Sequence, residues 1–201
     1  MDSGMWDARY STDELVWKAD PNRFVAEEVR DMESGRALDV ACGEGRNALW
    51  LAEGGWDATG VDFSPVGLDK ARSIAARRGV EVEWIEADVL TWEPAVDAFD
   101  LIVVAYLQLP EDERRHVHRA LVRGIAPGGT LLVIAHDRTN LIEGVGGPQT
   151  PHVLFSPDDV VHDVEGCGLD VVRAGRVLRP VGTPEGTRDA IDALVRLSRP
   201  R

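Results

Sequence analysis

The stretch Leu38-Asp39-Val40-Ala41-Cys42-Gly43-Glu44-Gly45-Arg46-Asn47 decides the fold of this chain. Its first residues are mostly apolar, which is typical of a buried strand, and the pair Gly43-x-Gly45 follows directly. Apolar residues at helical spacing come next, so we expect a helix to begin at once. Glycines at such a junction permit a tight turn and let a ligand approach the backbone, where free amide groups of the first helical turn face it. The stretch therefore predicts a strand-loop-helix unit that binds a ligand at the carboxyl end of its strand.

Apolar strands and helical patterns continue to alternate after this unit, which is typical of an α/β fold with both sheet faces covered. The remaining parallel strands are expected at 58–61, 80–85, 101–105 and 130–135. The last two strand-like segments, 169–178 and 189–199, are joined by a turn at 181–186 with no helix between them. We therefore expect these two segments to pair antiparallel. The chain is predicted to form a doubly wound, mostly parallel sheet that ends in an antiparallel strand.

Residues 1–34 precede the first strand and are expected to form a helical extension to a ligand-binding domain at 35–201. Ser11 and Glu14 have the spacing of a capping box, which predicts a short helix through Trp17. Asp20 is expected to cap a second helix.

Composition excludes several classes of function. The 201 residues carry a formal net charge of −13, and a field of that sign repels nucleic-acid backbones. Two cysteines imply no disulfide framework, the first residues lack the apolar core of a secretory signal, and the apolar run 101–107 is too short to span a bilayer. We expect a cytoplasmic protein, a monomer or homodimer, with a small-molecule partner and no metal, membrane or nucleic-acid partner.

Three acids, Asp39, Asp62 and Asp88, end three successive predicted strands. A carboxylate at Asp39 would repel a pyrophosphate but suits an ammonium group. At Asp62 it can accept hydrogen bonds from ribose hydroxyls, and at Asp88 from an adenine amino group. The glycine pattern followed by Ala48 also fits the dinucleotide fingerprint, so a nicotinamide-dependent oxidoreductase is the alternative. The three acids together favour a ligand that is cationic at one end and has no phosphate.

A family resemblance rests on five sequence motifs that occur in a fixed order along the chain. They are 38–47, 60–64, 86–88, 99–102 and 126–131. This set resembles class I methyltransferases over about 35–136, and the form Cys42-Gly-x-Gly-Arg-Asn47 further resembles the tellurite-resistance (TehB-like) methyltransferases. The resemblance implies a seven-stranded Rossmann-like sheet and S-adenosylmethionine as cofactor. It also implies that Asp39, Gly43 and Gly45 hold the methionine part, Asp62 the ribose and Asp88 the adenine.

The predicted cofactor site lies at the strand ends. Its residues are Asp39, Ala41, Gly43, Glu44, Gly45, Asn47, Asp62, Phe63, Ser64, Ala87, Asp88, Val89 and Ala105. Phe63 and Val89 are expected to sandwich the adenine ring. Methyl transfer from a sulfonium releases a neutral leaving group, so it mainly needs an aligned nucleophile and no fixed catalytic set.

Candidates for the acceptor side follow the fourth and fifth strands. Tyr106, His136 and Asp137 are the catalytic candidates, since they are able to orient an acceptor or take its proton. Substrate or lid candidates are Trp6, Tyr10, Arg46, Gln149 and His152. The TehB-like resemblance favours a thiol or chalcogen acceptor, and a metabolite oxygen or nitrogen stays open. A non-catalytic module that binds S-adenosylmethionine is a further alternative.

Overall fold

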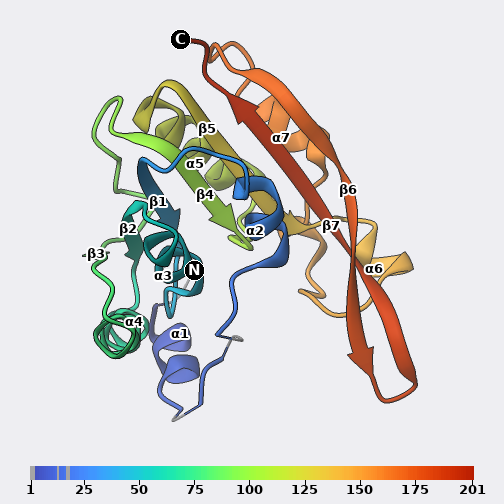
Figure 1. The fold of residues 1–201 in the computed structure, drawn as a ribbon. Coiled ribbons are helices and arrows are strands. Elements are labelled where there is room, and N and C mark those ends of the chain that lie inside the picture. The colour runs from blue at the N-terminus through green and yellow to red at the C-terminus, as the bar shows by residue number, and fades with distance from the viewer. Residues whose placement is uncertain (1–2, 13, 17–18) are drawn as a thin grey trace.

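The computed structural model describes residues 3–12, 14–16 and 19–201 and contains one seven-stranded sheet of order β3-β2-β1-β4-β5-β7-β6 (Figure 1). The strands are β1 (Arg36–Val40), β2 (Asp57–Asp62), β3 (Glu83–Glu86), β4 (Phe99–Ala105), β5 (Ile125–His136), β6 (Asp170–Thr183) and β7 (Gly186–Ser198). The first five strands pair in parallel, and β7 lies antiparallel to both β5 and β6. The predicted fold class is confirmed.

Helices cover both faces of the sheet. They are α1 (Ser3–Tyr10), α2 (Arg23–Val29), α3 (Arg46–Glu53), α4 (Pro65–Arg78), α5 (Glu111–Gly124), α6 (Asn140–Glu143) and α7 (Pro157–Asp163). Successive residues of β4 face opposite sides of the sheet: Ile102 packs in a core with α5 and α7, and Leu101 packs in a core with α2 and α3. Among the described residues no helix combines the length and apolar character that crossing a membrane requires.

The N-terminal extension differs from the prediction. A helix is present at α1, whereas residues 14–16 are not helical, and Trp17 lies outside the described residues. The hydroxyl of Ser11 donates to the carbonyl of Asp7 at 2.6 Å, so Ser11 follows α1 and does not cap a later helix. The cap of α2 is Asn22, because its side chain accepts from two amides at the start of that helix.

The antiparallel hairpin is longer than predicted. Pairing between β6 and β7 runs from Asp170 opposite Ser198 to Thr183 opposite Gly186, so most of the expected turn is strand. Pairing of β7 with β5 stops at Asp192 opposite His136, and the rest of the hairpin extends beyond the sheet as an arm (Figure 1). In contrast, β3 is shorter, because α4 ends in a left-handed Gly79 and Val80 bonds back to that helix.

A buried ion pair joins α5 to α7. The basic residues of α5, among them Arg114 and His118, have the sequence of a solvated face. That interpretation is wrong for these two residues: both are buried, and each lies within 2.9 Å of Asp163 Oδ2. The Arg114 guanidinium also stacks over Phe155 at 4.8 Å. The partner carboxylate is 45 or more positions away in sequence, so only the tertiary fold brings these groups together.

Candidate functional site

The carboxyl ends of β1 and β2 bring two buried acids to one edge of the sheet. Asp39 of β1 is 1% exposed and Asp62 of β2 is 5% exposed. β1 and β2 are adjacent and parallel, with Asp39 paired to Gly60 and Val40 to Val61. Ligands of open α/β sheets bind outside this edge, so the two acids lie where the sequence predicts a site.

The loop from β1 to α3 has three residues in the left-handed region, Ala41, Gly43 and Gly45, with φ of 54°, 55° and 79°. Asp62 holds this loop in place. Its Oδ2 accepts from the Gly43 amide at 2.8 Å and its Oδ1 from the Ser64 amide at 2.9 Å. Burial raises the pKa of Asp62, and these amide hydrogen bonds oppose that rise. Asp62 therefore fixes the glycine loop at the carboxyl end of β2.

Asp39 is hydrogen-bonded to the start of α3. Its carboxylate accepts from Asn47 Nδ2 at 3.4 Å and from the Ala48 amide at 3.1 Å. Burial above all raises the pKa of Asp39 to about 7. Asn47 in turn accepts from the Asn22 amide at 2.9 Å, which ties the cap of α2 to the same point. The predicted residues Asp39 and Asn47 are thus brought together.

The predicted adenine end lies at β2 and β3. Asp88 is exposed, and its Oδ1 accepts from the Leu90 amide at 2.9 Å, so it caps its own turn. Val89 is buried and Phe63 is half-buried. The Ala87 amide donates to the Asp62 carbonyl at 3.0 Å, which places this turn beside the end of β2.

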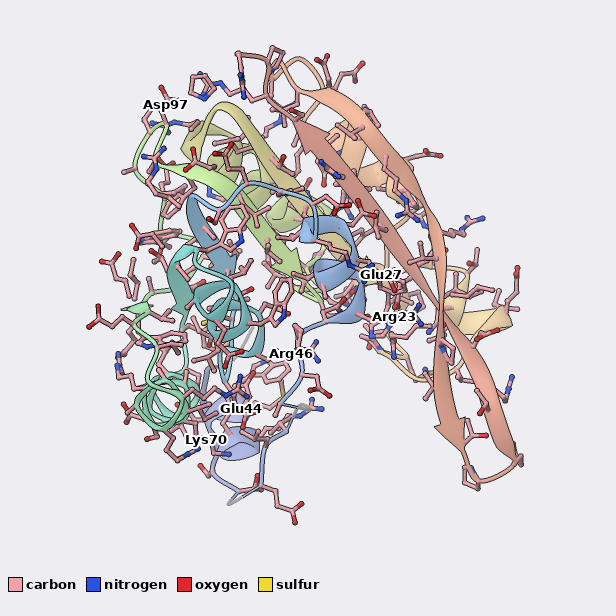
Figure 2. The ribbon with its side chains drawn as sticks, in the orientation of Figure 1. Arg23, Glu27, Glu44, Arg46, Lys70 and Asp97 are labelled. Carbon is pink, nitrogen blue, oxygen red and sulfur yellow. The ribbon has the colours of Figure 1, made fainter. Side chains whose placement is uncertain are left out.

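Glu44 lies on the other side of the glycine loop. Its carboxylate accepts from Lys70 Nζ at 3.1 Å and from the Val16 amide at 3.3 Å. Figure 2 shows Glu44 and Lys70 close together. The side chain of Glu44 is therefore engaged in holding the N-terminal segment, apart from the strand-end acids.

Helix α1 covers the glycine loop. Trp6 and Tyr10 are both on this helix, and their rings stack at 5.6 Å. Tyr10 is buried, and a Cβ added at Gly43 would lie 2.5 Å from its hydroxyl oxygen. Asp7 accepts a hydrogen bond of 2.5 Å from Ser64 Oγ, which fastens α1 to the cap of α4. Figure 1 shows α1 against α4 at this end of the sheet.

A second polar group lies at the carboxyl ends of β4 and β5, where the middle of β7 pairs with β5. Tyr106 Oη donates to Asp192 Oδ2 at 2.8 Å, and Arg179 Nε donates to the same oxygen at 2.7 Å. His136 Nδ1 is 3.2 Å from Asp192 Oδ1, and its ring lies 4.8 Å from that of Tyr106. Burial and the Asp192 charge raise the pKa of Tyr106 to about 12, so Tyr106 is protonated at neutral pH. We call Tyr106, His136, Arg179 and Asp192 the acceptor cluster.

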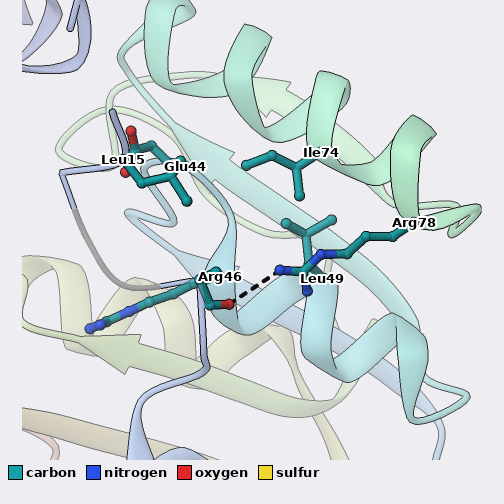
Figure 3. Close-up of a pocket in the computed structure, with 7 residues that line it drawn as sticks. Leu15, Glu44, Arg46, Leu49, Ile74 and Arg78 are labelled. Carbon is teal, nitrogen blue, oxygen red and sulfur yellow. Dashed lines mark hydrogen bonds between the residues drawn. The ribbon is translucent and has the colours of Figure 1, made fainter. Parts of the chain in front are cut away.

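Arg46 lies between the two groups. Burial lowers its pKa, and Tyr106, Asp39 and Arg179 are among the groups that act on its charge. It lines a hollow of about 10 Å³ together with Leu15, Ala19, Glu44, Leu49, Ile74 and Arg78. Figure 3 shows the Arg46 guanidinium extending away from the other labelled side chains. A hollow of that volume holds about one water molecule, so it is not the place of a nucleoside.

Three further candidates do not join the acceptor cluster. Asp137 accepts from the Thr139 amide and hydroxyl and from Arg176 Nε at 3.0 Å, so it shapes the turn after β5. Gln149 and His152 are exposed. The same loop nevertheless reaches the cluster at Gly147, where an added Cβ would lie 2.9 Å from the His136 ring.

Sequence reasoning missed Asp192 and Arg179. Both are on the β6–β7 hairpin, far along the chain from Tyr106. A signal is present for Asp192, since it is a single acid within the apolar run Ala190-Ile191-Asp192-Ala193-Leu194. A buried charge in a strand requires partners, and it therefore marks a candidate site.

Residues 37–129 match the family model described as a methyltransferase domain. The match covers a little under half of the chain, and the seven-stranded sheet that surrounds it has the class I methyltransferase fold. The cofactor of this class is S-adenosylmethionine, as the sequence predicted. A 2-heptyl-1-hydroxyquinolin-4(1H)-one methyltransferase of Mycobacteroides abscessus is 32% identical over 127 residues, which are 62% of this chain and 55% of that protein. The chain thus spans about half the length of this relative.

Solved structures share the fold of the methyltransferase domain. The N-methyltransferase NodS of Bradyrhizobium japonicum, in complex with S-adenosylhomocysteine, has a TM-score of 0.76 at 20% identity and is covered over 98% of its length by 99% of this chain. TehB of Haemophilus influenzae has a TM-score of 0.72 at 17% identity, with 99% of this chain and 67% of that chain covered. At these identities the likeness concerns the fold.

Proposed function

We propose that this chain transfers the methyl group of S-adenosylmethionine to a small-molecule acceptor at the carboxyl edge of the sheet. The observation that carries the proposal is the pair of buried acids, Asp39 and Asp62, on either side of the glycine loop. An acid at Asp62 suits the ribose of either cofactor, whereas a buried carboxylate at Asp39 suits a cationic ligand and opposes a diphosphate. This favours a methyltransferase over the nicotinamide-dependent alternative.

The donor set fits the cofactor. A carboxylate has about four lone-pair positions, and the Gly43, Ser64 and Phe63 amides act on Asp62, so one position remains for a ribose hydroxyl. Asp39 and the glycine loop would hold the methionine part. Asp88 would accept from the adenine amino group, between Phe63 and Val89. The bound cofactor supplies an electrophilic methyl group, and the chain's own part is to align an acceptor with it.

The acceptor cluster is the proposed acceptor side, with Tyr106 and His136 as the groups that meet the acceptor. The hydroxyquinolone methyltransferase among the relatives supports a small-molecule acceptor.

We propose residues 1–34 as a lid and residues 35–201 as the catalytic domain. Cytoplasmic location, the oligomeric state and the absence of a nucleic-acid partner stay predictions.

Calorimetry followed by a methyl-transfer screen tests the proposed function. S-adenosylhomocysteine is expected to bind and NADH is not. Thiols, phenols, selenite and tellurite are then offered with S-adenosylmethionine, and S-adenosylhomocysteine formation is measured by mass spectrometry. Turnover with any of these acceptors supports the enzyme. Tight NADH binding would establish the oxidoreductase alternative in its place, and cofactor binding with no turnover would favour a non-catalytic module.

Cofactor binding is expected to depend on pH through Asp39. The ionised form attracts the ligand ammonium, so binding lowers the pKa of Asp39 from about 7 and releases a proton at lower pH. Affinity should rise with pH up to about 7 and then level off, with Kd falling by nearly tenfold per pH unit below that point. Titration of S-adenosylhomocysteine at several pH values measures this. Asp39→Asn should bind more weakly with a flatter profile, and an equally steep profile in this variant would exclude Asp39.

Loosening α1 is expected to speed cofactor exchange. Asp7→Ala removes the hydrogen bond from Ser64 Oγ and keeps both strand-end acids, and it also removes the Asp7 charge that raises the pKa of Asp62. A lid that opens more readily should release S-adenosylhomocysteine several times faster in stopped-flow fluorescence, with Trp6 as a nearby reporter. Glu113→Ala on α5 serves as a remote control. Equal release rates in wild type and Asp7→Ala would argue against a lid.

A further inference from the structure

Asp192 is a buried acid that meets three polar side chains. It lies between Ile191 and Ala193 in β7 and is fully buried. Tyr106 and Arg179 both donate to its Oδ2, and Arg179 Nη2 adds a longer contact of 3.4 Å to Oδ1. The remaining neighbour of Oδ1 is His136 Nδ1 at 3.2 Å. Asp192 is therefore the common partner of the acceptor cluster.

The charge state of Asp192 follows from these contacts. Burial alone would raise its pKa, but His136 and Arg179 outweigh burial and hold the pKa below its usual value. An ionised carboxylate only accepts hydrogen bonds. A neutral imidazole that faces it through Nδ1 is thus stabilised with the proton on Nδ1, which leaves Nε2 free to accept a proton.

The His136 ring is held by its surroundings. Its backbone amide donates to Gln108 Oε1 at 2.8 Å, and Tyr106 and Gly147 lie against the ring. Nδ1 is buried, and at 3.2 Å from Asp192 its geometry falls short of a hydrogen bond. Catalytic hydrogen bonds often align only when a ligand is bound. The His136 side chain is 14% exposed and Nδ1 is its fully buried nitrogen, so Nε2 is the nitrogen that can meet a ligand.

Charged groups lie on the elements that surround the acceptor cluster. Arg179 comes from β6, Asp192 from β7, and Asp137 follows His136 at the end of β5. Tyr106 and Arg179 both act on the charge of Arg46 from α3. Two guanidinium groups near Tyr106 favour negative charge developing on an acceptor placed there.

We propose that Asp192 is a positioning residue that fixes His136 with Nδ1 protonated, and that the acceptor is a neutral weak acid carrying an O–H, N–H or S–H group. The proposal rests on the proposed function. The acceptor proton passes to His136 Nε2, and the freed lone pair forms the bond to the methyl carbon. The sulfur–methyl bond breaks with its electron pair left on sulfur, so the leaving thioether is neutral. The proton then passes from His136 to water.

The tautomer of His136 is the first test, and it needs no acceptor. Heteronuclear NMR of the imidazole nitrogens, with S-adenosylhomocysteine added, reports which nitrogen carries the proton. The expected neutral form has the proton on Nδ1 in the wild type. Asp192→Asn should shift the proton toward Nε2, because the amide is able to donate to Nδ1. A wild-type ring with the proton on Nε2 would overturn the proposal.

Acceptors of graded acidity provide the second test. The series runs from phenol to nitrophenols that are already ionised at the assay pH. His136→Gln and Asp192→Asn should slow methylation of the neutral phenols by about 100-fold or more and change that of the ionised phenols by only a few-fold. A merely structural role would slow every phenol equally, and that result would overturn the proposal.

Controls separate this proposal from the proposed function. His162→Gln replaces an exposed histidine on α7 and should leave all rates unchanged. The Kd for S-adenosylhomocysteine should stay within about twofold of the wild-type value in His136→Gln. If Asp192→Asn is unstable, the rates of His136→Gln across the phenol series decide whether methylation depends on the acidity of the acceptor. Failure of the wild type to bind S-adenosylhomocysteine would reject the proposed function itself.

Discussion

Replacing Asp163 by alanine is expected to lower the free energy of unfolding by about 3 to 5 kcal/mol, the range for removing one partner of a buried ion pair. Arg114 Nε lies 2.7 Å from the Asp163 carboxylate, and both side chains are buried. The variant would leave this guanidinium without its counter-charge, and His118 would lose its partner as well. Urea unfolding followed by circular dichroism measures the loss.

An exposed acid on α5, the helix that carries Arg114, provides the matched control for Asp163. Asp112 is fully exposed and lies 3.9 Å from Arg115. Asp112→Ala is expected to leave the free energy of unfolding close to the wild-type value, as is usual for surface pairs. A loss below about 1 kcal/mol in Asp163→Ala would mean that the buried ion pair does not hold α7 to α5.

Asp62→Ala is expected to weaken S-adenosylhomocysteine binding by at least about tenfold, or 1.4 kcal/mol. The variant removes the proposed ribose acceptor. It also removes the hydrogen bonds that hold the Gly43 and Ser64 amides, so the glycine loop loses its support. Titration calorimetry gives the affinity, and thermal unfolding shows whether the variant remains folded.

Glu86 is the matched control for Asp62, because it pairs with Asp62 in the sheet and is exposed. Glu86→Ala should keep wild-type affinity. Unchanged affinity in Asp62→Ala, with the fold intact, would refute the ribose assignment.

Features that depend on neighbouring residues could be predicted from the sequence. The strand, the left-handed glycines and the start of α3 lie within 38–47, so their pattern is complete in one short stretch. The capping box at Ser11 failed although it is local, because the Ser11 hydroxyl bonds backward to the end of α1. The spacing of Ser11 and Glu14 does not show whether the serine hydroxyl caps a following helix or bonds back to the preceding one.

Features that depend on the topology could be predicted only in part. The strand-end acids were expected to meet because parallel strands share a carboxyl edge. Tyr106 and His136 were expected as candidates, but their common partner Asp192 comes from an antiparallel strand whose register the sequence does not specify. The arm of the hairpin and the Arg114–Asp163 pair depend on the same long-range placement.

A crystal structure of the chain with S-adenosylhomocysteine tests the central claim most directly. The account predicts a ribose hydroxyl on Asp62, the ligand ammonium nearest to Asp39, and the sulfur facing Tyr106 and His136. A nucleoside bound elsewhere, or one that leaves Asp62 with only its amide contacts, would contradict it.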